Sequence, residues 1–201
     1  MPLVSKKIIS KTVRAKTKTS LKIPYLIKFL NPRDIINNLE ILPGMKVAQF
    51  GCGTGFFTFP VAEKVGKNGV VYALDILEQK VEAIKSQAKL SNLGNIIVKK
   101  VNLEEKEGSE IKKESVDWVI MANMLYQNRN KSYIIKEAKR ILKKDGRALL
   151  IDWNPANNAI GPKKHYRVSK EELVKIIKKY RLNVQEELAV GDFHFGMVLV
   201  K

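Results

Sequence analysis

An apolar stretch runs straight into three alternating glycines near residue 50, and few folds accommodate that combination. The stretch reads Val47-Ala48-Gln49-Phe50-Gly51-Cys52-Gly53-Thr54-Gly55. We predict a buried strand over residues 45–50 and a helix over residues 56–65, with the glycines forming the loop between them. Glycine tolerates positive φ and close backbone approach, so this loop can hold a ligand against the start of the helix. A tight turn without a ligand is the alternative.

Two common nucleotide-binding signatures do not fit this loop. A dinucleotide-binding loop needs glycine at position 56, where this chain has Phe56. A phosphate-binding loop needs Ser or Thr after Gly-Lys, but Gly66-Lys67 is followed by Asn68. The spacing therefore disfavours a nicotinamide-dependent oxidoreductase and a nucleoside triphosphatase.

Strand and helix patterns alternate along the rest of the chain. Asn31-Pro32 predicts a helix start, and Ser169 with Glu172 predicts a second capped start. Five strand-then-helix units indicate parallel strands joined by right-handed crossovers, with helices on both faces. The last two strands are joined by a short turn and predict an antiparallel hairpin. The expected fold is a Rossmann-like three-layer αβα sandwich with a mostly parallel seven-stranded sheet. The expected ranges are strands at 45–50, 70–74, 96–101, 116–121, 147–153, 183–190 and 195–201, and helices at 31–40, 56–65, 77–91, 131–143 and 169–180.

A second landmark lies one strand further along. An apolar strand over residues 70–74 ends in Asp75, twenty residues after Gly55. A carboxylate at that place can accept both hydroxyls of a ribose bound beside the glycine loop. Asp75 could equally cap the helix that begins near Leu77, and the two roles are compatible.

Charge divides the chain into two parts. It contains 37 Lys+Arg and 20 Asp+Glu, giving a net charge of +17. Residues 1–28 contain eight basic and no acidic side chains, so we treat residues 1–30 as a basic N-terminal arm and residues 31–201 as one domain. The arm could bind RNA or another anionic partner, or it could be a solvated tail.

The remaining composition indicates a protein of a reducing compartment. Cys52 is the one cysteine, so an intrachain disulfide is impossible. No apolar run reaches the length of a signal peptide or a membrane span. With two histidines and this cysteine, no metal site is predicted. We expect a cytoplasmic protein.

These landmarks together resemble the class I S-adenosylmethionine-dependent methyltransferases, and most closely the small type 11 methyltransferase-like proteins of bacteria and archaea. The resemblance covers about residues 31–201. It implies an enzyme that uses S-adenosylmethionine, with the glycine loop around the methionine part of the cofactor and Asp75 on the ribose. The cofactor-binding residues that it implies are Gln49, Gly51, Cys52, Gly53, Gly55, Asp75, Ile76, Asn102, Leu103 and Asn123.

Two positions depart from the family pattern. Gln49 replaces an acid that helps hold the amino group of the cofactor, and Asn102 replaces an Asp. A lost charge-assisted hydrogen bond costs roughly 1.5–3 kcal/mol, so we expect cofactor binding weaker by about tenfold or more.

Candidates for proton transfer or acceptor positioning follow the fourth and fifth strands. Asp152 is the first choice as base or anchor, with capping of the following loop as the alternative. Tyr126 is a second candidate. The loop 154–168 is long enough to cover a site, and His165 within it faces either the acceptor or solvent.

The leading hypothesis is methyl transfer from S-adenosylmethionine to a small or lipid-like acceptor. One alternative is an RNA methyltransferase that grips phosphates with residues 1–28. Another is a cofactor-binding relative without turnover.

Overall fold

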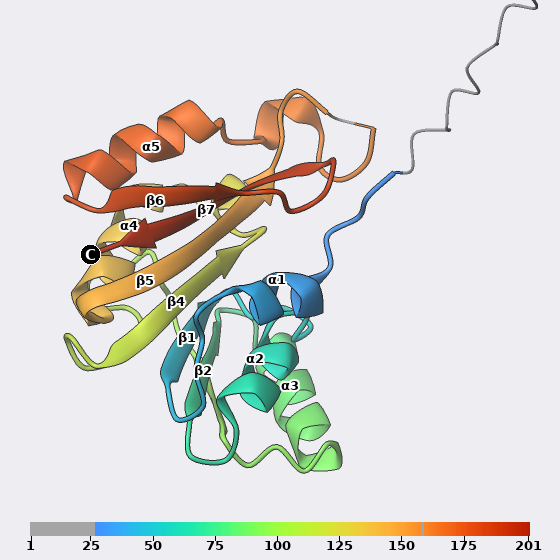
Figure 1. Cartoon of the computed structure of the whole chain (residues 1–201), viewed down its shortest axis with the longest axis vertical. Helices are drawn as coiled ribbons and strands as arrows, with labels where there is room; N and C mark the ends of the chain where they lie inside the picture. Colours follow the sequence, from blue (N-terminus) through green and yellow to red (C-terminus); the bar gives the residue numbers. More distant parts are fainter. Residues whose placement is uncertain (1–26, 158) are drawn as a thin grey trace, which may run out of the picture.

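The computed structural model describes residues 27–157 and 159–201. Of the predicted basic arm, only residues 27–30 lie within this part, so the hypothesis about residues 1–28 falls almost wholly outside the described residues. The domain itself contains one seven-stranded sheet with helices on both faces (Figure 1). The elements are α1 (Pro32–Asn38), β1 (Lys46–Phe50), α2 (Thr58–Val65), β2 (Val70–Asp75), α3 (Glu78–Leu90), β3 (Ile96–Lys100), β4 (Val116–Ala122), η1 (Leu125–Gln127), α4 (Lys131–Ile141), β5 (Leu142–Trp153), η2 (Lys164–Tyr166), α5 (Lys170–Lys179), β6 (Asn183–Leu188) and β7 (His194–Val200).

The sheet has the strand order β3-β2-β1-β4-β5-β7-β6. The first five strands are parallel, and β7 runs antiparallel to both β5 and β6. The order reverses between β1 and β4, and ligands of open α/β sheets bind beyond the carboxyl ends of the strands at such a point. The predicted fold class, including the antiparallel C-terminal hairpin, is confirmed.

Two apolar cores sandwich the sheet. One joins α4 and α5 to one sheet face through Ile134, Ile141 and Leu173, which are completely buried. The other joins α1 and α2 to the opposite face through Ile36 and Val61. Both predicted helix caps are confirmed. Their hydrogen bonds run from Arg33 N to Asn31 Oδ1 (3.1 Å) and from Glu172 N to Ser169 Oγ (3.1 Å).

The boundary between α4 and β5 differs from the sequence prediction. We expected a helix through Lys143 and a strand from Arg147, but α4 ends at Ile141 and β5 begins at Leu142. Leu142 is fully buried and pairs with Val116, after which the register shifts. Burial of this leucine against β4 ends the helix early, and the intervening residues form a bulge rather than a turn. No helix of the described residues is long and apolar enough to cross a membrane.

Candidate functional site

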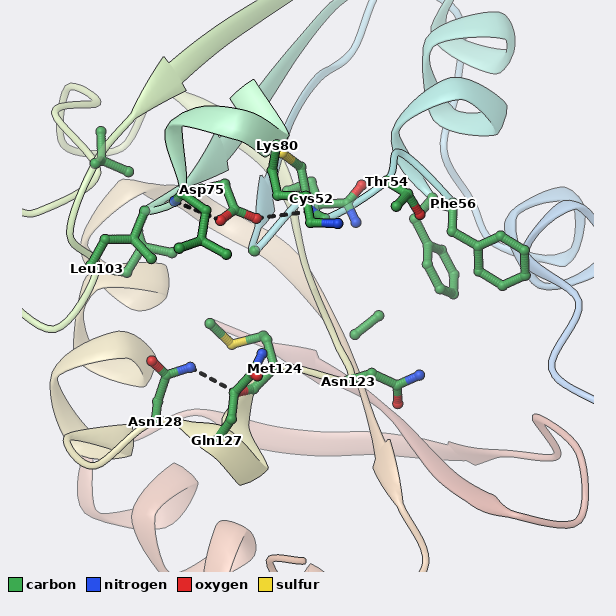
Figure 2. Close-up of a pocket in the computed structure, with 18 of the residues that line it drawn as sticks. Cys52, Thr54, Phe56, Asp75, Lys80, Leu103, Asn123, Met124, Gln127 and Asn128 are labelled. Carbon is green, nitrogen blue, oxygen red and sulfur yellow. Dashed lines mark hydrogen bonds between the residues drawn. The ribbon is translucent and has the colours of Figure 1, made fainter. Parts of the chain in front are cut away.

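A cavity of about 590 Å³ opens at the carboxyl ends of the parallel strands. That volume lies within the range of small-molecule and cofactor sites. Figure 2 shows Asp75, Cys52 and Lys80 on one wall and Met124, Gln127 and Asn128 on the other, with open space between them. The loops that follow β1, β2, β3 and β4 supply the walls. The lining residues are Gln49, Gly51, Cys52, Gly53, Thr54, Phe56, Phe57, Asp75, Ile76, Leu77, Lys80, Val101, Asn102, Leu103, Glu104, Ala122, Asn123, Met124, Gln127 and Asn128.

Two glycines of the loop after β1, Gly53 and Gly55, have different structural roles. Gly53 lines the cavity at φ 54°, and a Cβ there would meet no atom within 4 Å, so its backbone is open to a ligand. Gly55, at φ 85°, does not line the cavity. A Cβ at Gly55 would lie 2.2 Å from the Phe59 ring and 2.7 Å from Ile84. Gly55 therefore allows α2 and α3 to pack beneath the loop, which is a different role from the ligand contact that we predicted.

Asp75 ties the loop after β1 to the loop after β2. Gly53 N donates to Asp75 Oδ2 at 2.9 Å, and Leu77 N donates to Asp75 Oδ1 at 3.0 Å. Leu77 is the residue at which α3 is capped, so Asp75 acts just before the helix cap and not as the cap itself. Each carboxylate oxygen keeps a lone pair for a further donor, because such an oxygen accepts more than one hydrogen bond.

Gln49 and Cys52 form part of the cavity floor. Thr58 Oγ1 donates to Gln49 Oε1 at 3.0 Å, and both side chains are buried. Burial, assisted by the charge of Asp75, raises the pKa of the Cys52 thiol to about 12. Cys52 is therefore a neutral thiol at physiological pH, and it acts through its shape rather than as a nucleophile.

The loops after β2 and β3 supply apolar side chains and one amide side chain to the cavity wall. Ile76 lines the cavity with an exposed side chain, and Leu103 lines it from a buried position. The Asn102 amide is engaged within its own loop: Nδ2 donates to Glu105 Oε1 at 2.7 Å, and Oδ1 accepts from Glu104 N at 3.1 Å. These three residues lie where the sequence predicts contacts with the cofactor.

The wall after β4 contains residues that the sequence analysis missed. Asn123 was predicted, and its Oδ1 is buried without a hydrogen-bond partner. Met124, Gln127 and Asn128 were not predicted, although η1 brings all three to the cavity. Asn128 Nδ2 donates to Met124 O at 2.7 Å, which fixes this turn. Met124, Gln127 and Asn128 follow a predicted strand closely, and that position is the feature of the sequence that could have indicated them as cavity residues.

The three residues predicted to act on the acceptor do not line this cavity. Asp152 is fully buried and accepts hydrogen bonds from Tyr126 N (3.1 Å) and Trp153 N (2.8 Å). The carboxylate thus binds the backbone at the end of its own strand and in the turn after β4; capping of the loop that follows β5 stays a prediction. Burial raises the pKa of Asp152 to about 6 and also raises the pKa of Tyr126. His165 is exposed, with its ring 4.1 Å from that of Tyr166. Their predicted roles remain predictions.

The residues of the cavity fit a nucleoside cofactor that ends in an amino acid. The open space at Gly53 leaves backbone free for contact, and Asp75 has acceptor capacity for ribose hydroxyls. Asn123 Oδ1 is a buried acceptor that lacks a partner, which a bound ligand can supply. The fold and this cavity together define a Rossmann-like protein whose site suits a nucleoside cofactor.

The comparisons with known proteins are consistent with that class. Residues 41–190 match the family model described as a methyltransferase domain, and this chain belongs to that family. A structure of an S-adenosylmethionine-dependent methyltransferase from Aquifex aeolicus superposes with a TM-score of 0.79 at 24% identity, covering 86% of this chain and 90% of that one. A structure assigned to a type 11 methyltransferase of Sulfolobus solfataricus superposes with a TM-score of 0.67 at 28% identity, covering 86% of this chain and 92% of that one. The implied cofactor is S-adenosylmethionine.

Curated relatives match over shorter lengths. Nocamycin O-methyltransferase from Saccharothrix syringae is 35% identical over 75 residues, which are 36% of this chain and 27% of that protein. Demethylmenaquinone methyltransferase from Lactococcus lactis is 31% identical over 115 residues, or 55% of this chain and 43% of that protein. The chain thus spans less than half the length of these relatives.

Proposed function

We propose that this protein transfers a methyl group from S-adenosylmethionine to a small, largely apolar acceptor. The cavity supports this proposal most directly, because it combines the Asp75 carboxylate, which has acceptor capacity to spare, with an apolar rim. Phe56 and Leu77 line the cavity, each is more than half exposed, and neither is among the residues assigned below to the cofactor. Exposed apolar side chains at a cavity mouth are typical of sites that bind apolar ligands.

Each part of the cofactor has residues that would hold it. The Asp75 carboxylate would accept the ribose hydroxyls, and Ile76 and Leu103 would flank the adenine. The backbone at Gly53 would contact the methionine part. Gln49 uses Oε1 on Thr58, so its amide nitrogen is the group left to face that end of the ligand. A nitrogen donor suits the carboxylate of the cofactor better than its ammonium group.

The bound cofactor supplies an activated methyl group, so the protein has mainly to orient the acceptor. Among the described lining residues, the carboxylates are Asp75 and Glu104. Asp75 carries two backbone hydrogen bonds, and Glu104 Oε2 accepts from Asn130 N at 2.7 Å. Asp75 would be occupied by the ribose, and Glu104 is held by the backbone at Asn130, so neither is placed as a base for the acceptor. We therefore favour an acceptor with an acidic hydroxyl or an activated carbon, because it loses its proton without a dedicated base.

The curated relatives support an acceptor of this kind. They are named for nocamycin, aklanonic acid and demethylmenaquinone, all of which are small organic molecules. The RNA alternative depends on residues 1–28, and the cavity offers no specific observation in its favour.

Titration calorimetry with S-adenosylhomocysteine tests the cofactor site. We expect one-to-one binding that is weakened roughly 10- to 100-fold by Asp75→Ala, because hydrogen bonds to a charged group are lost. Glu82→Ala is the matched control, since Glu82 is an exposed acid on α3 that pairs with Lys85 and does not line the cavity. Equal losses in both variants would count against a ribose-binding role for Asp75.

Transfer of a radiolabelled methyl group to naphthoquinols, phenols and an RNA homopolymer then tests the acceptor class. Labelling of a quinol or phenol supports the proposal. Labelling of RNA alone would overturn it, and cofactor binding without any transfer would favour the non-catalytic alternative.

A further inference from the structure

Three chain segments meet beside the mouth of the cavity. They are residues 27–29, residues 154–157 and 159–166 of the loop after β5, and residues 191–193 of the turn before β7; we call them together the docking face. Asp192 N donates to Lys28 O at 2.9 Å, and Lys28 N donates to Asp192 Oδ2 at 2.7 Å. Asn154 N donates to Phe193 O at 2.9 Å, and Asn157 Nδ2 donates to Asp192 O at 3.0 Å. In Figure 1 the blue segment before α1, the orange loop and the red turn lie on the right-hand side of the molecule.

The docking face adjoins the cofactor cavity through the sheet. Asn123, which lines the cavity at the end of β4, donates its backbone N–H to Ile151 O of β5 at 2.9 Å. The loop of the docking face leaves the sheet two residues later, at the end of β5. The docking face and the cavity therefore lie at the same edge of the sheet, beside the neighbouring ends of β4 and β5.

Arg167 fixes the loop of the docking face in place. Its buried guanidinium donates to the carbonyls of Pro162 (2.9 Å), Asn154 (2.7 Å) and Ile160. It also lies 5.4 Å from the centre of the Trp153 ring. The loop is thus anchored from within, and its outer side chains are presented to solvent in a defined arrangement.

The docking face exposes large apolar side chains, and the charged side chains of its loop after β5 are basic. Phe29 is 65% exposed, Ile27 is 54% exposed, and Ile160 and Tyr166 are also exposed. None of these four lines the cavity, so a bound cofactor would not cover them. Residues 154–166 contain Lys163 and Lys164 but no Asp or Glu. Exposed apolar groups gathered beside a site mark an interaction surface.

The sequence that precedes the docking face adds to its charge. Residues 1–28 hold eight Lys+Arg and no acid, and they join the described structure at this face. Basic segments are attracted to anionic lipid surfaces, and apolar side chains beside them enter the interface. Phe29 and Tyr166 are aromatic and could stack on bases, but Ile27 and Ile160 are exposed aliphatic side chains, for which base stacking has no use and a lipid interface does.

We propose that the docking face binds the surface of an anionic lipid bilayer, with the cavity mouth beside the membrane. This inference rests on the proposed function, since an apolar acceptor dissolved in lipid would enter the cavity from that side. In this proposal the protein binds to the surface of the bilayer and does not cross it; no helix among the described residues could cross a membrane.

Vesicle sedimentation of the full chain tests the proposal. We expect binding to vesicles of phosphatidylcholine with phosphatidylglycerol, little binding to phosphatidylcholine alone, and weaker binding at high salt. The double variant Phe29→Ser/Ile160→Ser should lower the partition coefficient about tenfold or more. Leu42→Ser/Leu90→Ser is the matched control, because these exposed apolar residues follow α1 and end α3, away from the docking face. The control should bind vesicles as the wild type does.

Two results would overturn the proposal: equal losses in the two double variants, or binding to an RNA homopolymer without binding to anionic vesicles. Titration of each variant with S-adenosylhomocysteine separates this test from that of the cofactor site. A variant that binds the ligand normally is folded, so its loss of vesicle binding reports on the docking face. Vesicle binding by a wild type that fails to bind S-adenosylhomocysteine would reject the proposed function and leave the docking face standing.

Discussion

Gly53 and Gly55 show that two neighbouring glycines can be required for unrelated reasons. Gly55→Ala places a methyl group on the Phe59 ring at positive φ, so we expect a loss of about 3 kcal/mol or more in unfolding free energy. Gly53→Ala meets open space and should cost about 1–2 kcal/mol from its backbone conformation alone. Because its methyl group would point into the cavity, it should also abolish most cofactor binding. Urea unfolding and calorimetry distinguish the two; stable Gly55→Ala protein would refute the packing role.

The buried Asp152 carboxylate should make stability depend on pH. Its folded pKa of about 6 lies above the ordinary value, so its contribution is present below about pH 4 and is lost as pH rises through 6. Relative to Asp152→Asn, the wild type should lose about 2–3 kcal/mol of unfolding free energy between pH 4 and pH 7. Urea unfolding at several pH values measures this, with the exposed Asp34→Asn as control. If the difference in unfolding free energy between the wild type and Asp152→Asn did not change with pH, burial would not raise the pKa of Asp152.

At the scale of elements, α4 holds the loop after β3 through Glu137 and Arg140, which pair within the helix and bond to the loop at Ser109 and Ile111. Arg140 donates to Glu137 from Nε and Nη2, both at 2.7 Å, and Ser109 N donates to the same carboxylate at 3.1 Å. Burial alone would raise the pKa of Glu137, but the hydrogen bonds from Arg140 and Ser109 hold it below the ordinary value. The loop that carries Asn102 and Leu103 to the cavity is thus fixed from the opposite side.

Glu137→Ala should therefore destabilise the protein by about 3–5 kcal/mol at neutral pH, because a guanidinium and a buried N–H lose their partner. The loss should shrink as the pH falls below the ordinary carboxyl pKa and through the lowered pKa of folded Glu137, because the wild-type carboxylate then loses its charge as well. Thermal unfolding of Glu137→Ala against the exposed Glu82→Ala measures the effect. Similar midpoints for the two variants would mean that this ion pair contributes little.

At the scale of the whole molecule, the reversal of strand order between β1 and β4 creates the site. The loops after β1 and β4 diverge there, and the cavity opens between them. The hairpin of β6 and β7 extends the other side of the sheet and brings the turn at Phe193 against Phe29, with ring centres 5.6 Å apart. The docking face is a product of this extension, since its three segments are far apart in sequence.

The sequence by itself determined the alternation of elements, the strand-loop-helix at the glycines and the carboxylate at Asp75. These are local features: periodicity, caps and turn residues act within a few positions, so they can be read without knowing the fold. The resemblance that followed from them was confirmed by the family to which the chain belongs.

Only the tertiary structure decided what each candidate side chain touches. It buried Asp152 against backbone N–H groups, placed Gly55 under α2 rather than in the cavity, and brought Met124 and Gln127 to the wall. It also ended α4 early, because Leu142 gains more from burial against β4 than from one more helical residue. Contacts between distant segments depend on packing, and the sequence pattern shows which residues are apolar but not which partners they meet.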